Sequence, residues 1–158
     1  MLRTLPIIAA VLLTACGGLS TAQHTAARNA LTTLKRVQAA TQVGVTHQQY
    51  GQLVIDAKEQ VNEAARVLPD GELRRELSGA MDAYADAGQV WGIKVSTRSL
   101  DPHTEPGTTL MRKYNLKVLQ ACPQCREPTE YLSEDGAMQA AWAVANTHLD
   151  RAAPLLDL

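Results

Sequence analysis

The sequence lacks phenylalanine, and aromatic residues make up only 4 % of its 158 positions. It also lacks an excess of either charge, because 15 lysine and arginine residues nearly balance 16 aspartate and glutamate residues. Without a basic excess, a nucleic-acid-binding protein that works by bulk charge is disfavoured. With 46 % apolar residues and a net charge of −1, the composition is not that of a disordered chain. We expect one folded domain that binds no nucleic acid.

Motifs of catalysis are absent as well. The chain has no Gly-x-Ser-x-Gly, no phosphate-binding loop and no Rossmann fingerprint. No glutamate is followed three residues later by histidine, so the paired Glu-x-x-His of di-iron bundles is missing. We therefore predict a protein that is not an enzyme and needs no cofactor.

The N-terminus has the organisation of an export signal. Arg3 precedes an apolar run that ends at Leu13. The run is shorter than the about 20 residues that span a bilayer and has the length of a signal-peptide core. It closes in Leu13-Thr14-Ala15-Cys16, which resembles the lipobox of bacterial lipoprotein precursors. The resemblance implies cleavage after Ala15 and lipidation of Cys16.

The chain is expected to have three parts. The resemblance implies a signal peptide over residues 1–15 and a lipid on Cys16. The small, polar residues that follow indicate a flexible tether over 16–24, and we expect a single helical domain over 25–158. Each buried methylene contributes about 0.8 kcal/mol, so several acyl chains on Cys16 would hold the protein durably on a lipid bilayer. Gly17 in place of Asp implies the outer membrane, facing the periplasm, if the cell has two membranes. The alternative is an ordinary secretory signal that leaves Cys16 free.

The rest of the chain predicts helices and no strand, because alanine is abundant and β-branched runs are scarce. Gly44 would end a first helix over residues 25–42. A capping-box pattern at Thr46 and Gln49 opens a second helix. An apolar stripe at helical spacing follows it, made of Tyr50, Leu53, Val54, Ala57, Val61, Ala64 and Leu68. The turn Pro69-Asp70-Gly71 leads into a third helix.

The short turn makes the second and third helices antiparallel neighbours. Counting outward from it places Tyr50 near Gly88 and Trp91, and Lys58 within reach of Asp82 or Asp86.

The C-terminal third predicts two more helices. A loop is expected over residues 96–108, a fourth helix over 109–121 before Pro123, and a last helix from Ser133 or Glu134. The inner face of the last helix is expected to contain Ala137, Ala140, Ala141, Val144, His148 and Ala152. The fold class is thus an all-α antiparallel bundle of four or five helices after the signal peptide and tether.

Cys122 and Cys125 would be the remaining thiols once Cys16 carries lipid. Because an exported protein meets an oxidising compartment, we predict a disulfide between them. A redox-active cysteine pair is a second interpretation. Such pairs usually lie after a strand, at the N-terminus of a helix, whereas this motif follows a predicted helix. A zinc site is a third, and it would need His103 or His148 as further ligands.

The stretch from Tyr50 to Trp91 loosely resembles helical domains of bacterial envelope proteins to which no activity is assigned. The leading hypothesis is therefore a lipid-anchored, non-enzymatic structural or protein-interaction module of the cell envelope. Its partners would be the bilayer and an envelope protein. The alternative is a binding protein for a small apolar ligand or a metal, using Cys122 and Cys125 or the aromatic residues Tyr50, Tyr84 and Trp91. The alternative interpretation is that these aromatic residues are simply the large residues of the hydrophobic core.

Overall fold

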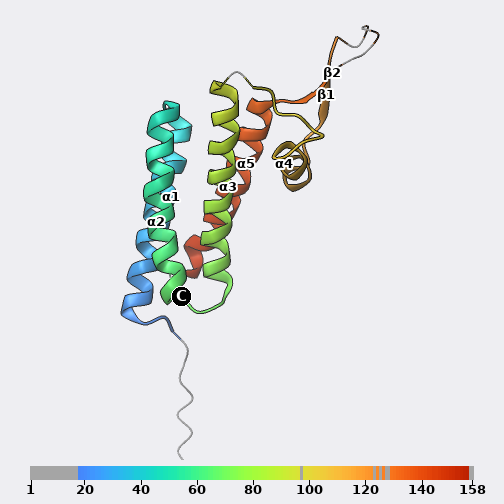
Figure 1. Ribbon diagram of the computed structural model, residues 1–158. Helices are drawn as coiled ribbons and strands as arrows, with labels where there is room; N and C mark the ends of the chain where they lie inside the picture. The colour runs from blue at the N-terminus through green and yellow to red at the C-terminus, as the bar shows by residue number, and fades with distance from the viewer. Residues whose placement is uncertain (1–17, 97, 123, 125, 127–128, 157–158) are drawn as a thin grey trace, which may run out of the picture.

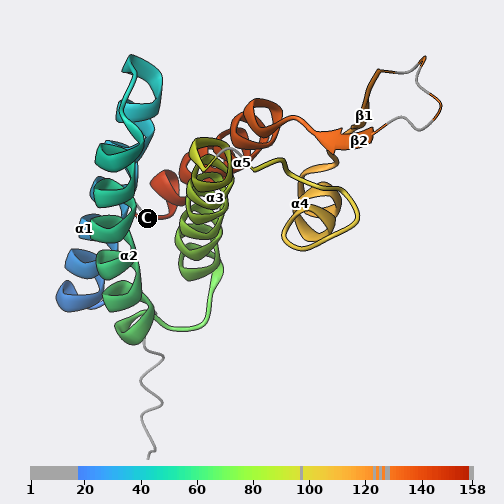
Figure 2. The same ribbon diagram turned by 45° about the horizontal axis from the view of Figure 1, so that its top comes forward.

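The computed structural model describes residues 18–96, 98–122, 124, 126 and 129–156 (Figure 1). In chain order the elements are α1 (Thr21–Val43), α2 (His47–Val67), α3 (Glu72–Val95), α4 (Gly107–Tyr114), β1 (Val118–Ala121), β2 (Thr129–Leu132) and α5 (Glu134–Leu155). The four long helices run alternately up and down, and the α1–α2 pair packs against the α3–α5 pair (Figure 2). The predicted all-α bundle is confirmed.

The two ends of the bundle differ. At the first, which we call the N-terminal end, the start of α1 meets the ends of α2 and α5. Gln23 Nε2 donates to the Val67 carbonyl oxygen at 2.9 Å, and His24 Nε2 lies 3.0 Å from the Leu156 carbonyl oxygen. At the other, which we call the hairpin end, Lys94 pairs with Asp135 where α3 ends and α5 begins. The β1–β2 hairpin projects from this second end (Figure 1).

Local capping signals set the helix boundaries. The Thr46 side chain caps the Gln49 N–H and Gln49 returns a hydrogen bond to the Thr46 N–H, so the predicted capping box is confirmed. Gly44 ends α1 with φ 95°, a value that favours glycine. The sequence reading missed an equivalent box formed by Ser20 and Gln23, which starts α1 at Thr21. Residues 21–24, which we assigned to the flexible tether, are therefore helical.

Small side chains fill the interface between α3 and α5. Alanines of both helices are fully or almost fully buried there, including Ala80, Ala83, Ala87, Ala137, Ala141 and Ala145. The predicted inner face of α5 is only partly correct. Ala137, Ala141 and Ala152 are buried as expected, but Leu149 takes the buried place given to His148, which stays partly exposed.

The predicted helix over residues 109–121 is wrong in its second half. Helix α4 ends at Tyr114 because Asn115 adopts a left-handed conformation, with φ 51° and ψ 46°. The chain then forms β1, which pairs antiparallel with β2. Pairing with a segment eight or more positions away overrides the helical spacing of the apolar residues, so the expectation that the chain has no strand is also wrong.

Within the described residues, no helix combines the length and the apolar character that crossing a membrane requires. The residues expected to form the signal peptide, together with Cys16, lie outside the described part of the chain.

Candidate functional site

Strand β2 attaches the hairpin to the bundle. The Leu132 N–H donates a 2.9 Å hydrogen bond to the Leu100 carbonyl oxygen, and both side chains are buried. Farther along the strand, His103 Nε2 lies 2.7 Å from a carboxylate oxygen of Glu130. Strand β2 is thus held on the side that faces away from β1, and β1 is the outer strand.

Strand β1 is exposed along its whole length, and its apolar residues Val118 and Leu119 are 40 % and 38 % exposed. Because the Leu132 N–H points to Leu100, Leu132 and its partner Val118 form a non-hydrogen-bonded pair. Gln120, two residues along β1, is also in a non-hydrogen-bonded pair, because the two kinds of pair alternate in an antiparallel ladder. The backbone N–H and C=O groups of Val118 and Gln120 therefore face the free edge of the hairpin.

Two basic residues flank this edge in the sequence, while Glu130 on the neighbouring strand lies against His103. Residues 96–126 carry five lysine or arginine residues against two acidic ones, whereas the chain as a whole has a net charge of −1. Lys117 precedes β1 directly, and Arg126 lies in the connection between the strands. An exposed strand edge with apolar side chains and positive charge can add an extended segment of opposite charge.

Helix α4, which precedes β1, is fixed to α3 by one carboxylate. Asp86 Oδ2 accepts hydrogen bonds of 2.6 Å from both Lys113 Nζ and the Tyr114 hydroxyl. Burial, reinforced by the hydrogen bond to Asp86, raises the pKa of Tyr114 well above its usual range, so this hydroxyl stays a donor. Among the described residues, Lys58 forms no ion pair with Asp82 or Asp86, the two carboxylates predicted to be within its reach, and Asp86 pairs with Lys113 of α4.

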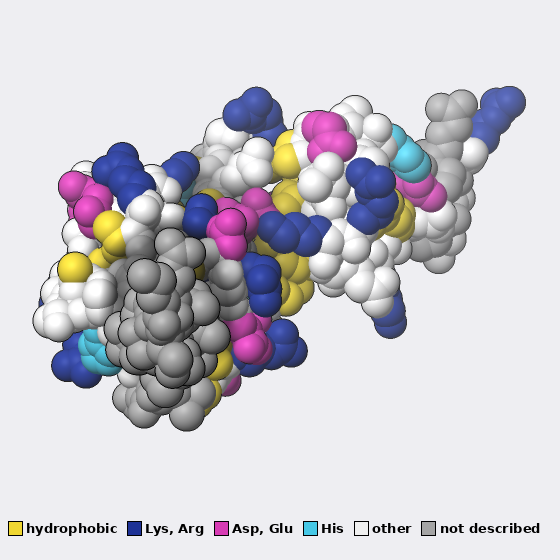
Figure 3. Space-filling view, turned by 90° about the horizontal axis from the view of Figure 1, so that it is seen from below, with side chains coloured by type: hydrophobic (Ala, Val, Ile, Leu, Met, Phe, Trp, Pro, Cys, Tyr) yellow, Lys and Arg dark blue, Asp and Glu magenta, His cyan; other side chains and the backbone are white. Residues whose placement is uncertain are grey.

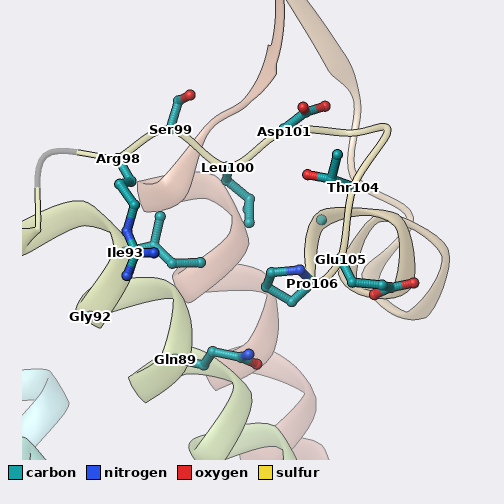
Figure 4. A pocket seen from close by; sticks show the side chains of 11 residues that line it. Gln89, Gly92, Ile93, Arg98, Ser99, Leu100, Asp101, Thr104, Glu105 and Pro106 are labelled. Atoms are coloured by element: carbon teal, nitrogen blue, oxygen red, sulfur yellow. The ribbon is translucent and has the colours of Figure 1, made fainter.

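A pocket of about 540 Å³ opens between α3 and the loop that leads into α4 (Figure 4). Leu100, Pro106 and Gln89 point toward it, whereas Asp101 points away. Gly107 allows the loop to fold this tightly, because a Cβ atom there would lie 1.8 Å from the Asp101 carbonyl oxygen. The wall is more polar than apolar, which does not suit the small apolar ligand that we considered.

The aromatic residues proposed as a pocket instead pack on one another. The Tyr50 ring centroid lies 5.4 Å from that of Trp91, and Gly88 leaves room for the Tyr50 ring. The predicted position of Tyr50 near Gly88 and Trp91 is therefore confirmed. Tyr50 and Tyr84 are fully buried. Trp142, which the sequence reading missed, completes the cluster at 6.0 Å from Tyr50. These rings fill the space between α2, α3 and α5, so they act as core.

The cysteine motif is described only in part. Cys122 directly follows β1, has φ 51° and is disulfide-bonded. Cys125 lies outside the described residues, so the Cys122–Cys125 pairing stays a prediction.

The histidines considered for a zinc site have other contacts. His103 lies against Glu130, and His148 Nδ1 lies 2.7 Å from a Glu76 carboxylate oxygen. Among the described residues, no three histidine, cysteine, aspartate or glutamate side chains group closely enough to hold a metal ion.

No family model matches the chain, and neither the curated proteins nor the solved structures include a significantly similar one.

Proposed function

We propose that this protein is a lipid-anchored module of the bacterial cell envelope that uses its β1–β2 hairpin to bind a protein partner. The four-helix bundle is then a spacer. Helix α1 alone has 23 residues, which at about 1.5 Å per residue gives a length of roughly 35 Å. A lipid on Cys16 would lie at the N-terminal end, and the bundle would hold the hairpin that far from the membrane.

The observation that carries the proposal is the free edge of β1. Four consecutive exposed residues offer unpaired backbone groups at Val118 and Gln120, next to apolar and basic side chains. Single exposed apolar residues elsewhere on the bundle, such as Ile55, lack a strand edge beside them. The partner that fits is an extended, acidic segment of another protein, which would pair with β1 and contact Lys117 and Arg126. No catalytic step or cofactor is part of this function.

The experiment is site-specific photocrosslinking in the membranes of the producing cell. A photoreactive residue replaces Leu119 in one variant and Ile55, which is 62 % exposed, in a control. We expect a discrete crosslinked band from position 119 that weakens at high salt, because exposed charge pairs are screened. Similar bands from both positions would contradict the proposal.

A second pair of variants separates strand pairing from simple proximity. Gln120→Pro removes an outward N–H without touching the ladder between β1 and β2. We expect it to abolish the crosslink, and Lys117→Glu to reduce it several-fold. Retention of the full crosslink in Gln120→Pro would exclude pairing along this edge.

A second candidate function is supported by the pocket between α3 and α4. Gln89, Arg98 and Thr104 line it beside the apolar Leu100, so the pocket offers several hydrogen-bonding groups to a small polar ligand. Native mass spectrometry of protein extracted from its own membranes tests this. A bound mass in the wild type that disappears in Gly107→Ala would favour a polar ligand, and an unoccupied wild type would count against it.

A further inference from the structure

A second pocket lies at the N-terminal end of the bundle, far from the hairpin. Its volume is about 230 Å³, and most of its wall is apolar. The apolar residues that form it are Leu19, Leu68, Pro69, Leu73 and Leu155. They come from three places that are distant in sequence: the segment before α1, the α2–α3 turn with the first turn of α3, and the last turn of α5.

The three walls are fixed relative to one another. Gln23 Nε2 ties α1 to the Val67 carbonyl oxygen, and His24 Nε2 lies against the Leu156 carbonyl oxygen. Leu68, which lines the pocket, is almost fully buried. The pocket is therefore formed before anything enters it, and its apolar wall favours an apolar occupant.

Charged residues of both signs also line the pocket. They are Glu72 and Arg74, and Arg74 pairs with Asp70 at 2.7 Å. Figure 3, seen from this end, shows basic and acidic side chains adjacent to one another. Because these charges are largely balanced, they give little selection for a charged ligand. The selection must come from the apolar wall.

The chain itself brings an apolar group to this place. Leu19, which lines the pocket, follows Cys16 by three residues, and three residues span at most roughly 10 Å. We propose that the pocket receives one acyl chain of the lipid on Cys16, which rests on the lipidation proposed above. The seated chain holds the N-terminal end of the bundle beside Cys16, while the remaining acyl chains on Cys16 stay in the bilayer, so the orientation of the hairpin above the membrane is set.

The experiment uses the full chain in the bacterium that makes it. Cells are fed a diazirine-bearing fatty acid, which lipidation would place on Cys16, and are irradiated before the protein is purified and digested. We expect mass spectrometry to find a crosslink within one chain, from the Cys16 lipid to the peptide that contains Leu73 or Leu155. The variant Leu73→Gln should lose at least four-fifths of this crosslink.

The control is Ile55→Gln, the same exchange of an apolar residue for glutamine on an exposed helix face far from the pocket, and it should leave the yield unchanged. Thermal unfolding by circular dichroism confirms that both variants are folded. A labelled Cys16 that crosslinks only to membrane lipids would overturn the pocket proposal and leave the anchor intact. A membrane phospholipid crosslinked in the pocket would show a different occupant and would also overturn the pocket proposal. Finding no label on Cys16 would instead overturn the anchor on which it rests.

Discussion

The indole N–H of Trp142 donates a 3.1 Å hydrogen bond to the hydroxyl of Tyr50, 92 residues earlier in the chain. The same hydroxyl donates to the Tyr84 carbonyl oxygen at 2.8 Å. One buried oxygen therefore connects α2, α3 and α5, and both of its hydrogen-bonding roles are satisfied. This arrangement is expected to matter for stability, because a buried polar group that loses its partner costs more than the hydrogen bond contributes.

Replacing Tyr50 by Phe removes that oxygen, so the Trp142 N–H loses its acceptor and the Tyr84 carbonyl loses its hydroxyl donor. We expect the free energy of unfolding to fall by about 1–3 kcal/mol, measured by urea denaturation. Tyr131→Phe on half-buried β2 is the matched control and should change stability by less than about 0.5 kcal/mol. In a double-mutant cycle with Trp142→Phe, the two effects should be non-additive. Additive effects would show that the Trp142–Tyr50 hydrogen bond is energetically unimportant.

Alkaline pH should unfold the protein through its buried tyrosines. Burial is the main cause that raises the pKa of Tyr50, Tyr84 and Tyr114 above their ordinary value, which is about 10. Below that pH both the folded and the unfolded states hold the proton, so stability is unaffected. Above it the unfolded state loses the proton first, so stability falls by about 1.4 kcal/mol per pH unit for each such tyrosine.

The measurement is urea denaturation between pH 7 and pH 11, in which we expect constant stability followed by a steep fall above about pH 10. Tyr114→Phe should make the fall shallower, because one group no longer titrates. An identical slope in the variant and the wild type would contradict the assignment.

Two glycines in helices should respond oppositely to alanine. A Cβ atom at Gly79 would lie 2.7 Å from the His148 ring, so Gly79→Ala must displace the imidazole from Glu76. We expect a loss of about 1–3 kcal/mol. At Gly51, a partly exposed position of α2, a Cβ atom meets nothing within 4 Å. Gly51→Ala should therefore stabilise by about 0.5–1 kcal/mol through helix propensity. Equal thermal shifts in the two variants would refute the steric argument.

Asp86 should control how firmly α4 stays on the bundle. Asp86→Asn removes the charge that faces Lys113 and weakens the acceptor for the Tyr114 hydroxyl. Hydrogen bonds to charged groups contribute about 1.5–3 kcal/mol, so we expect faster amide exchange across α4 with the four long helices unchanged. Asp82→Asn, at an exposed position of α3, the helix that also carries Asp86, is the control. Unchanged exchange in α4 would indicate that its apolar contacts suffice.

The sequence identifies the elements whose signals are local. Thr46 and Gln49 lie three positions apart and predict their own capping box, and the Pro69-Asp70-Gly71 turn places Tyr50 opposite Trp91 by counting alone. These signals were enough to predict the bundle. The start of α1 was missed although its box has the same pattern, because an adjacent stretch of small residues suggested a tether.

Contacts between distant segments could not be predicted in this way. The residues of strand β1 alone fit a helix, but β1 pairs with β2, whose Leu132 is held by Leu100, a partner 32 positions earlier. Trp142 joins the aromatic cluster through the rotation of α5, which an alanine-rich helix leaves undetermined from its pattern. Both pockets are formed by loops and helix ends brought together by the fold.

Because His24 and Leu156 meet, the described chain starts and finishes at one end of the bundle. A fluorescent protein fused after Leu158 would sit beside the start of α1, and a dye attached at residue 124 would sit at the opposite end. Under the lipid anchor proposed above, energy transfer from each to a labelled bilayer would report the height of both ends above the lipid. These two fixed positions therefore allow the proposed attachment to be measured.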